Sequence, residues 1–436
     1  MKKADIAELY QLFLRHPSVC TDSRHCIPDS LFFALKGENF NGNKFALAAI
    51  QTGCAYAIVD EEAYATDKRI ILVDNVLESL QGLARHHRLQ FPSLKVIGIT
   101  GTNGKTTTKE LTAAVLSQQF KVLYTQGNLN NHIGVPLTLL NLRAEHDMAI
   151  VEMGASHPGE IAELVELVCP DYGLITNVGK AHLEGFGSFQ GVIDTKTALY
   201  RYLQAHDGCV FYQSGNEILA PLARQGRSVA YVEGHCLEGQ AYAQLQWQGK
   251  QGRHLACTQL IGAYNQDNLL AAATIGLYFG VNEDDINRAL EAYQPSNNRS
   301  QWMQTARNRL IVDAYNANPS SMNVALDNFL NLSAPKRAVI LGAMRELGAY
   351  SLEEHQNILR KLCRQPLAFI YLVGEEFHEA YERLPREELL QNQDNIFFFS
   401  KMEDCRACLE AHQVQDCLIL VKGSHSNHLE RLIDLL

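Results

Sequence analysis

Short apolar runs alternate with turn-rich polar stretches over the first 92 residues. The runs at 31–35 and 55–59 have the length and composition of strands. Apolar residues at helical spacing predict a short amphipathic helix before Pro17 and a second helix over 75–91. The Phe-Pro-Ser sequence that follows breaks this second helix, and the first domain boundary is therefore predicted at 92/93.

The pattern changes at residue 94 into a repeated order of strand, glycine turn and helix. Strands are predicted at 96–99, 148–151 and 174–178, with a helix at 109–116 after the first. After the second strand, apolar residues recur at i, i+3, i+4 and i+7 from Ile161, which predicts another helix. This order is typical of a wound parallel sheet.

A polar stretch that contains proline, 294–298, marks the second predicted boundary. Beyond it, apolar runs again alternate with helical patterns. Strands are predicted at 310–313, 338–341, 368–373, 396–399 and 417–421. The expected fold class is therefore α/β with three domains, at 1–92, 93–298 and 299–436, the second a P-loop parallel-sheet domain and the third Rossmann-like.

Composition narrows the class of protein. Of the 436 residues, 46% are hydrophobic and 20% are charged, as in ordinary globular proteins. No apolar run approaches the ~18 residues of a membrane span, and polar residues interrupt the start where a signal peptide would be apolar. The net charge of −10 argues against nucleic-acid binding, and eleven irregularly spaced cysteines predict reduced thiols. A cytoplasmic monomer is expected.

The strongest chemical signal is a glycine-rich loop between a strand and a helix. It consists of Gly101, Thr102, Asn103, Gly104, Lys105, Thr106 and Thr107. Such a loop points backbone N–H groups at phosphate oxygens, while its lysine contacts the β- and γ-phosphates and its hydroxyl binds Mg²⁺. The first glycine of the common P-loop pattern is missing, because that position is Ile99. A chance Gly-Lys-Thr sequence is the alternative.

Three further residues follow the strands that neighbour this loop. Glu152 ends an apolar strand, where a carboxylate can bind Mg²⁺ or cap the next helix. His182 lies in a glycine-containing loop after the third strand, where it can be a metal ligand or a structural residue. Lys196, taken by itself, is a solvated helix lysine.

These segments together resemble the Mur ligase family of ATP-dependent, amide-forming cell-wall enzymes. The phosphate loop has the family's unusual TGTNGKT form, and residues 21–24 with 31–37 are similar to its amino-terminal UDP-sugar segment. Residues 262–268 resemble its adenine-contacting stretch, and Arg299 and Asp313 match positions that open its third domain.

Three stretches, at 127–138, 181–188 and 313–322, resemble the family member that joins D-alanyl-D-alanine to UDP-N-acetylmuramoyl-tripeptide. The resemblance implies reaction through an acyl phosphate with ATP and Mg²⁺, in bacterial peptidoglycan precursor synthesis and hence in cell shape and division. It also implies that the three domains bind, in order, the UDP-sugar, ATP and the dipeptide. The sequence departs from the pattern at Ala343, often acidic, and at His425, usually arginine.

The resemblance assigns roles residue by residue. The expected catalytic residues are Lys105, Lys196, His182 and Glu152. Thr106, Glu152, His182 and a carbamylated Lys196 are the expected metal ligands. Nucleotide contacts are expected from 101–107, Asn268, Arg299 and Asp313. Substrate contacts are expected from Ser23, Arg24, Asn128, Asn131, Asn316, Asn318 and Lys422.

Two other functions stay open at this point. One is a family ligase that adds a single amino acid, such as a folylpolyglutamate-type enzyme. The other is a nucleotide-dependent binding protein that has kept the loop without the chemistry. The joint presence of Lys105, Thr106, Glu152, His182 and Lys196 favours an enzyme over the binding protein.

Overall fold

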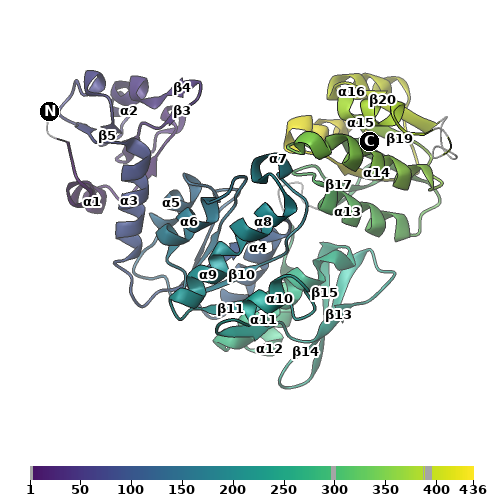
Figure 1. Cartoon of the computed structure of the whole chain (residues 1–436), viewed down its shortest axis with the longest axis horizontal. Helices are drawn as coiled ribbons and strands as arrows, with labels where there is room; N and C mark the ends of the chain where they lie inside the picture. Colours follow the sequence, from purple (N-terminus) through teal and green to yellow (C-terminus); the bar gives the residue numbers. More distant parts are fainter. Residues whose placement is uncertain (1–2, 296–300, 386, 388–394) are drawn as a thin grey trace.

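The computed structural model describes residues 3–295, 301–385, 387 and 395–436. Three lobes follow one another along the chain, with the first and third standing on either side above the second (Figure 1). Each lobe contains a mainly parallel sheet, which confirms the predicted α/β class. Among the described residues, no helix has the length and apolar character needed to cross a membrane.

The amino-terminal lobe contains a parallel sheet in the order β1-β2-β5-β6. Its elements are α1 (Ile6–Arg15), β1 (Val19–Cys20), β2 (Leu31–Phe33), β3 (Lys36–Gly37), β4 (Phe40–Asn41), α2 (Ala46–Gln51), β5 (Tyr56–Val59), β6 (Ile70–Leu72) and α3 (Val76–Arg88). Helix α1 begins with a capping box between Asp5 and Glu8 and buries Leu9 and Phe13, which confirms the predicted amphipathic helix.

Helix α3 connects the first two lobes. Its apolar face, with Leu80 and Leu83, lies in the same core cluster as Val135 and Leu139 of the central lobe. It contacts both α5 and α6 of that lobe. The predicted boundary at 92/93 falls in the loop after this helix.

The central lobe is built on a six-stranded parallel sheet in the order β12-β11-β10-β7-β9-β8. The strands are β7 (Lys95–Thr100), β8 (Val122–Tyr124), β9 (Met148–Glu152), β10 (Tyr172–Ile175), β11 (Cys209–Tyr212) and β12 (Ser228–Ala230). The helices are α4 (Lys105–Leu116), α5 (Gly134–Leu139), α6 (Glu160–Val168), α7 (Leu183–Phe186), α8 (Phe189–Lys196), α9 (Ala198–Ala205), α10 (Leu219–Ala223), α11 (Gln266–Phe279) and α12 (Glu283–Ala292).

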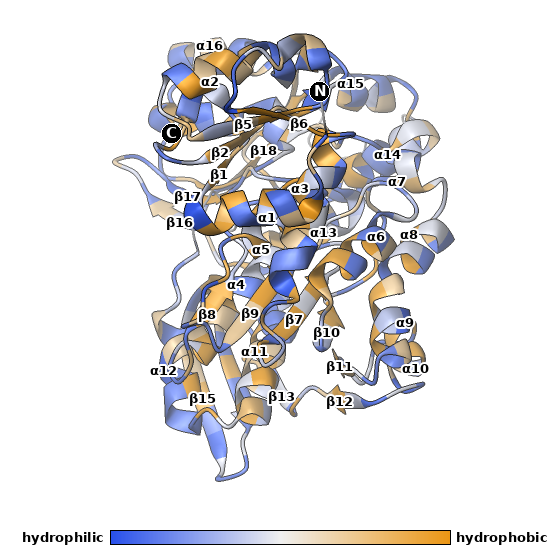
Figure 2. Cartoon of the chain, turned by 90° about the vertical axis from the view of Figure 1, so that its left-hand side faces the viewer, coloured by the Kyte–Doolittle hydropathy of each residue, from blue (hydrophilic) through white to orange (hydrophobic). Residues whose placement is uncertain are grey.

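Helices cover both faces of this sheet. Successive side chains of a strand point to opposite faces, so Val96 packs in the core with α6 and α9, while Ile97 and Ile99 pack in the core with α4 and α11. Strands buried on both faces are mainly hydrophobic in their interior, as the colouring of β7 and β9 in Figure 2 shows. This double burial produces the continuous apolar runs from which the strands were predicted.

Two features of the central lobe differ from the sequence prediction. The third strand ends at Ile175 instead of continuing to residue 178, because Thr176 and Asn177 donate side-chain hydrogen bonds to the carbonyl of Asn103. A small antiparallel sheet of β13 (Gly234–Cys236), β14 (Tyr242–Gln248) and β15 (Arg253–Ile261) had not been predicted.

The carboxyl-terminal lobe has a six-stranded sheet in the order β16-β17-β21-β18-β19-β20, in which only the edge strand β16 is antiparallel. Its strands are β16 (Gln301–Gln304), β17 (Arg309–Asp313), β18 (Arg337–Gly342), β19 (Ile370–Val373), β20 (Ile396–Phe399) and β21 (Leu418–Lys422). Its helices are α13 (Pro319–Asn331), α14 (Ser351–Cys363), α15 (Glu375–Glu382) and α16 (Met402–Ala411). The five strands predicted here are present. The predicted boundary at 298/299 lies outside the described residues.

A buried histidine in this lobe makes its stability depend on pH. His355 is fully buried, its Nε2 accepts a hydrogen bond from the Met344 N–H at 3.1 Å, and its Nδ1 donates to the Ser351 carbonyl at 2.7 Å. Burial lowers the pKa of His355 below its ordinary value. The stabilisation is therefore complete above the unfolded pKa of about 6.5 and is lost as the pH falls through the folded value.

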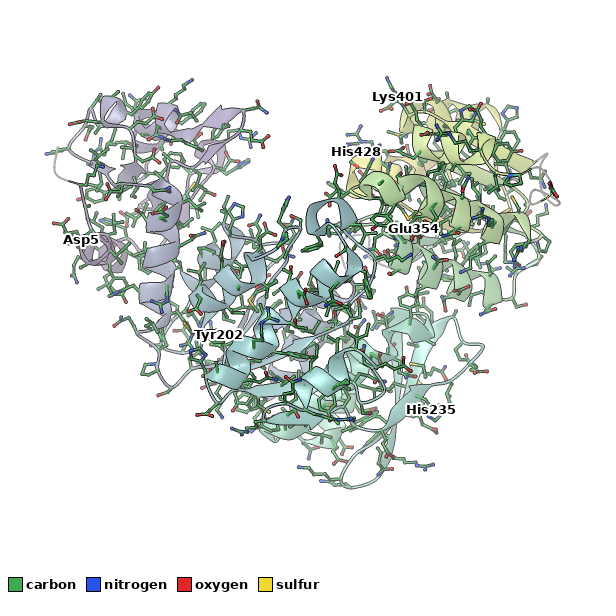
Figure 3. All side chains as sticks on the ribbon, in the orientation of Figure 1. Asp5, Tyr202, His235, Glu354, Lys401 and His428 are labelled. Atoms are coloured by element: carbon green, nitrogen blue, oxygen red, sulfur yellow. The ribbon has the colours of Figure 1, made fainter. Side chains whose placement is uncertain are left out.

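We expect the melting temperature of the chain to fall between about pH 6.5 and pH 5, and to fall less in His355→Gln, which cannot take up a proton. Thermal unfolding at a series of pH values measures this. The exposed His235, labelled in Figure 3, provides the control substitution His235→Gln. Equal acid sensitivity of all three proteins would contradict the assignment.

Candidate active site

A single large cavity lies where the three lobes meet. Its volume is about 1070 Å³. The amino-terminal lobe contributes Asn75, which caps α3, and Glu78 and Gln81 of that helix. The carboxyl-terminal lobe contributes residues around Asp313 and Ser321. The phosphate loop and the ends of the central strands form the rest of the wall. A cavity shared by three lobes can hold several substrates at once.

The phosphate loop is shaped by two glycines with positive φ. Gly101 has a φ of +147° and Gly104 a φ of +79°, conformations that favour glycine. A Cβ at Gly101 would also lie 1.9 Å from Oγ1 of Thr176, so no other residue fits there. Helix α4 begins directly after Gly104, and its free N–H groups face the loop. The chance-sequence interpretation of this motif is therefore wrong.

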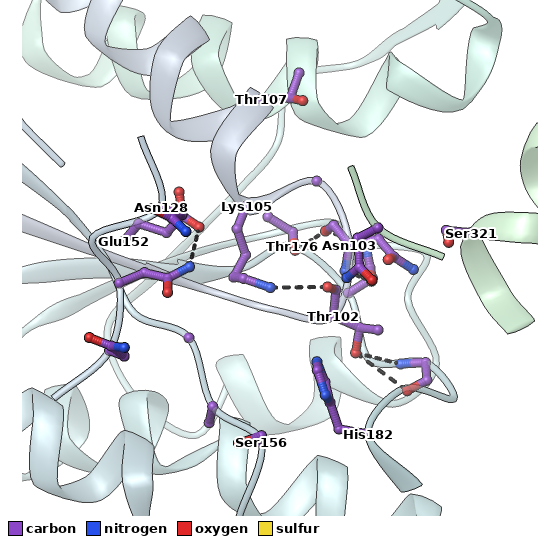
Figure 4. A pocket seen from close by; sticks show the side chains of 18 of the residues that line it. Thr102, Asn103, Lys105, Thr107, Asn128, Glu152, Ser156, Thr176, His182 and Ser321 are labelled. Carbon is purple, nitrogen blue, oxygen red and sulfur yellow. Dashed lines mark hydrogen bonds between the residues drawn. The ribbon is translucent and has the colours of Figure 1, made fainter. Parts of the chain in front are cut away.

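Lys105 bends back over the loop that precedes it. Its Nζ donates to the carbonyl of Gly101 at 2.8 Å and to that of Thr102 at 3.0 Å, and the second of these hydrogen bonds is drawn in Figure 4. Thr102, Asn103, Gly104, Lys105 and Thr107 all line the cavity. The lysine charge thus lies beside the N–H groups that would receive phosphate.

Glu152 is buried at the end of β9, with 1% of its surface exposed. The Thr106 hydroxyl donates to its carboxylate, at 3.0 Å from one oxygen and 3.2 Å from the other, and Nδ2 of Asn130 donates at 2.8 Å. Glu152 does not cap the next helix, because α6 has no side-chain cap and the N–H groups of Ser156 and His157 before it donate to Glu160. Asn130 was missed from the sequence, although it lies between the predicted Asn128 and Asn131, which both line the cavity.

His182 lines the same cavity but contacts the opposite lobe. It has a φ of +50°, and its Nδ1 pairs with the carboxylate of Glu346 from the carboxyl-terminal lobe. Among the described residues, no group of three or more His, Cys, Asp or Glu side chains has the arrangement of a metal site. Of the expected ligands, Thr106 and Glu152 are in direct contact, whereas His182 pairs with Glu346.

Lys196 is not a solvated helix lysine. It ends α8 with 2% of its surface exposed, and its Nζ lies 5.6 Å from the centre of the Phe186 ring. Burial lowers the pKa of Lys196 well below its ordinary value, and the positive charge of Lys105 lowers it further. Both effects favour the neutral form of this amine.

The expected nucleoside contacts lie on two lobes. Asn268 on α11 accepts a hydrogen bond from Thr108 at 3.0 Å and donates to Asn265 at 3.0 Å, which places its amide against the phosphate loop. Asp313 at the end of β17 accepts from the buried Lys422 at 2.5 Å. Arg299 lies outside the described residues.

The expected substrate residues divide into two groups. Asn316 and Lys422 line the cavity, with the Lys422 ammonium donating to the Asn316 carbonyl at 3.1 Å. Ser23 and Arg24 lie in a short 3₁₀ helix of the amino-terminal lobe, away from the cavity wall, where Arg24 pairs with Asp22. The large cavity thus does not include this first-lobe segment.

Asn318 joins the phosphate loop to the carboxyl-terminal lobe. Its Nδ2 donates to Oδ1 of Asn103 at 2.8 Å, while its Oδ1 caps the start of α13. A second inter-lobe contact joins Lys180 to Glu354 at 2.7 Å, and Glu354 is labelled in Figure 3. Nucleotide binding at the loop and the position of the third lobe are therefore mechanically connected.

A parallel sheet that ends in a phosphate loop, with two further lobes lining the same cavity, has the organisation of a nucleotide-dependent enzyme. Comparison with known proteins narrows this class. Residues 17–88 match the model described as Mur ligase family, catalytic domain, residues 99–276 match the Mur ligase middle domain, and residues 298–425 match the Mur ligase, glutamate ligase domain.

The chain is 32% identical to a UDP-N-acetylmuramoyl-tripeptide--D-alanyl-D-alanine ligase of Treponema pallidum, over 96% of this chain and 93% of the relative. The crystal structure of MurF from Acinetobacter baumannii superimposes with a TM-score of 0.84 at 32% identity, covering 98% of this chain and 97% of that one. MurF ligase from Thermotoga maritima in complex with ADP has a TM-score of 0.78 at 25% identity, with 97% of each chain covered. The chain belongs to the Mur ligase family, and it is an ATP-dependent ligase.

Proposed function

We propose that this ligase joins D-alanyl-D-alanine to the terminal carboxylate of UDP-N-acetylmuramoyl-tripeptide, in peptidoglycan precursor synthesis. The observation that carries the proposal is the buried Thr106–Glu152–Asn130 cluster beside the phosphate loop, in a cavity that all three lobes line. The similarity to ligases named for this activity extends over nearly the whole chain.

The phosphate loop and Lys105 hold the triphosphate of ATP through N–H groups and one fixed cation. Asn268 and Asp313 contact the nucleoside, and the family pattern adds Arg299. Thr106 and Glu152 provide a hydroxyl and a carboxylate oxygen, the hard donors that Mg²⁺ prefers, so their chemistry fits this ion. When bound, Mg²⁺ would offset the negative charge of the phosphates.

The reaction proceeds in two steps, a phosphoryl transfer and an amide formation. An oxygen of the tripeptide carboxylate attacks the γ-phosphorus, the bond to the β-phosphate oxygen breaks, and an acyl phosphate and ADP form. The amine of D-alanyl-D-alanine then attacks the acyl carbonyl, inorganic phosphate leaves, and the amine loses its proton. Both first reactants are anions, so Lys105 must offset their repulsion as well as the charge of the transition state.

Lys196 acts in this scheme as a carbamate. Its neutral amine adds to CO₂ and releases a proton, which replaces an ammonium with an oxygen-bearing anion. The lowered pKa of Lys196 supplies the neutral amine that this addition needs. A carbamate can orient a hard metal ion as a carboxylate does, whereas an ammonium would repel it.

The lobes bind the three reactants separately. The amino-terminal lobe, with Ser23 and Arg24, binds the UDP-sugar, and the carboxyl-terminal lobe, with Asn316 and Lys422, binds the dipeptide. An acyl phosphate hydrolyses in water, so the lobes close before it forms. The Asn103–Asn318 contact supports this coupling, because it ties the loop that binds ATP to the lobe that binds the dipeptide.

The test is the substrate dependence of phosphate release. With ATP and UDP-N-acetylmuramoyl-tripeptide present, we expect sustained phosphate release only when D-alanyl-D-alanine is added, with a product heavier by the dipeptide less one water. Release with a single amino acid instead would identify a different ligase of the family. No release under any of these conditions would identify a binding protein.

A further inference from the structure

A second lysine lies behind the phosphate loop, one turn of α4 after Lys105. Lys109 is fully buried, with 0% of its surface exposed. Its Nζ lies 3.8 Å from Oε2 of Glu152 and 3.5 Å from Oε1 of Glu110, and 5.8 Å from the centre of the Tyr124 ring. Within the described part of the chain this ammonium makes no hydrogen bond.

An ammonium group buried in this way is costly unless opposite charge lies close to it. Glu152 meets that requirement, because it is itself 1% exposed and its two hydrogen-bond donors, Thr106 and Asn130, are both neutral. Among the residues that the structure describes, Lys109 is the only cation within ion-pair distance of Glu152. Lys109 and Glu152 therefore form a fully buried pair whose net charge is zero, while the other acidic neighbour of Lys109, Glu110, is partly exposed, with 18% of its side chain accessible.

This pairing has a consequence for the binding of a divalent cation. A cation that bound Glu152 without nucleotide would bring two positive charges next to Lys109, and because the Lys109 side chain is fully buried the repulsion between them would be weakly screened. A cation that arrives with a nucleoside triphosphate brings the negative charge that cancels this excess. Lys109 thus penalises the bare cation more than the cation–nucleotide complex.

We propose that Lys109 is a positioning residue that holds the Glu152 carboxylate in place when the site is empty and makes divalent-cation binding conditional on nucleotide. The inference rests on the proposed role of Glu152 as the residue that holds Mg²⁺. It adds a cation to the site that the sequence resemblance did not assign, and it gives that cation a function separate from contact with phosphate.

Mn²⁺ binding to the full chain tests the proposal, measured with and without ADP as the loss of the free-ion electron paramagnetic resonance signal beyond that of a matched sample without protein. We expect the wild type to bind Mn²⁺ much more weakly without ADP than with it. Lys109→Met, or Lys109→Gln, should bind Mn²⁺ without ADP at least tenfold more tightly than the wild type. Glu110→Gln removes the other acidic neighbour of Lys109 and leaves the positive charge of Lys109 in place. This variant should behave as the wild type.

Equal Mn²⁺ binding without ADP by the wild type and the neutral Lys109 variants would overturn the proposal, while Mn²⁺ binding with ADP would leave the proposed function intact. Failure of every protein to bind Mn²⁺ with ADP would instead remove the proposed role of Glu152, and this inference with it.

Thermal unfolding without metal tests the charge pair independently, even if the neutral Lys109 variants do not fold. Glu152→Gln leaves the buried ammonium with only the partly exposed carboxylate of Glu110 beside it, so the melting temperature of this variant should fall by several degrees below that of the wild type. A melting temperature for Glu152→Gln equal to that of the wild type would show that the two charges are not paired, and would also overturn the proposal.

Discussion

Replacing Lys196 with alanine should lower kcat by about 10³-fold, the size of effect seen when one preorganised electrostatic contact is lost from a transition state. The chain should stay folded, because the small side chain leaves the surrounding core in place and removes a buried amine that is costly to charge. The expected loss arises because a carbamate at this position supplies anionic oxygens that alanine cannot supply.

Added short carboxylic acids, such as formate or acetate, should restore part of the activity of Lys196→Ala by occupying the vacated space with similar oxygens. Removal of bicarbonate and CO₂ should slow the wild type and leave the variant unaffected. Lys250→Ala, at an exposed lysine of the β14–β15 hairpin, is the matched control. An active Lys196→Ala enzyme that ignores bicarbonate depletion would show that this lysine has only a packing role.

Replacing Lys105 with alanine should abolish measurable turnover, a loss of about 10³-fold or more, since its charge stabilises the transferring phosphoryl group. In this structure its ammonium donates to two carbonyls of the loop, and the residue is only partly buried. Circular dichroism and the melting temperature should therefore stay close to those of the wild type. Steady-state phosphate release measures the loss of turnover, and ATP titration measures the effect of the substitution on nucleotide binding.

The exposed Lys121, at the start of β8 in the same lobe, gives the control Lys121→Ala, which should turn over normally. Wild-type activity of Lys105→Ala would remove the phosphate-loop interpretation altogether. A variant that fails to fold would contradict the claim that this lysine acts on phosphate charge and not on packing.

The parts of the site that depend on one strand and its following loop could be predicted from the sequence. The phosphate loop and Glu152 follow neighbouring parallel strands, and parallel strands direct their carboxyl ends to one edge of the sheet. Their apolar runs and the glycine pattern are both local, so position along the chain was enough to bring Thr106 and Glu152 together.

The contacts between lobes could not be predicted in this way. The pairing of His182 with Glu346 and of Asn103 with Asn318 joins residues more than 160 positions apart, and it depends on how two lobes sit against each other. Local periodicity carries no information about that arrangement. The family resemblance predicted His182 as a metal ligand, whereas in this structure it pairs with Glu346 of the other lobe.

Lys109 was missed for a different reason. A lysine among threonines and a glutamate in a helix has the composition of an exposed surface, and only the packing of α4 against β9 and its neighbours buries it. The antiparallel β13–β14–β15 sheet was missed because its strands alternate buried and half-exposed residues within a lobe whose other strands are uniformly apolar.

Oxygen transfer from the acceptor carboxylate to phosphate tests the acyl phosphate route most directly. The terminal carboxylate of UDP-N-acetylmuramoyl-tripeptide is labelled with ¹⁸O at both oxygens, and the enzyme is supplied with ATP and D-alanyl-D-alanine. Mass spectrometry of the released phosphate should find one ¹⁸O atom in each molecule, with the other retained in the new amide. Unlabelled phosphate, released while the dipeptide product accumulates, would contradict an acyl phosphate intermediate.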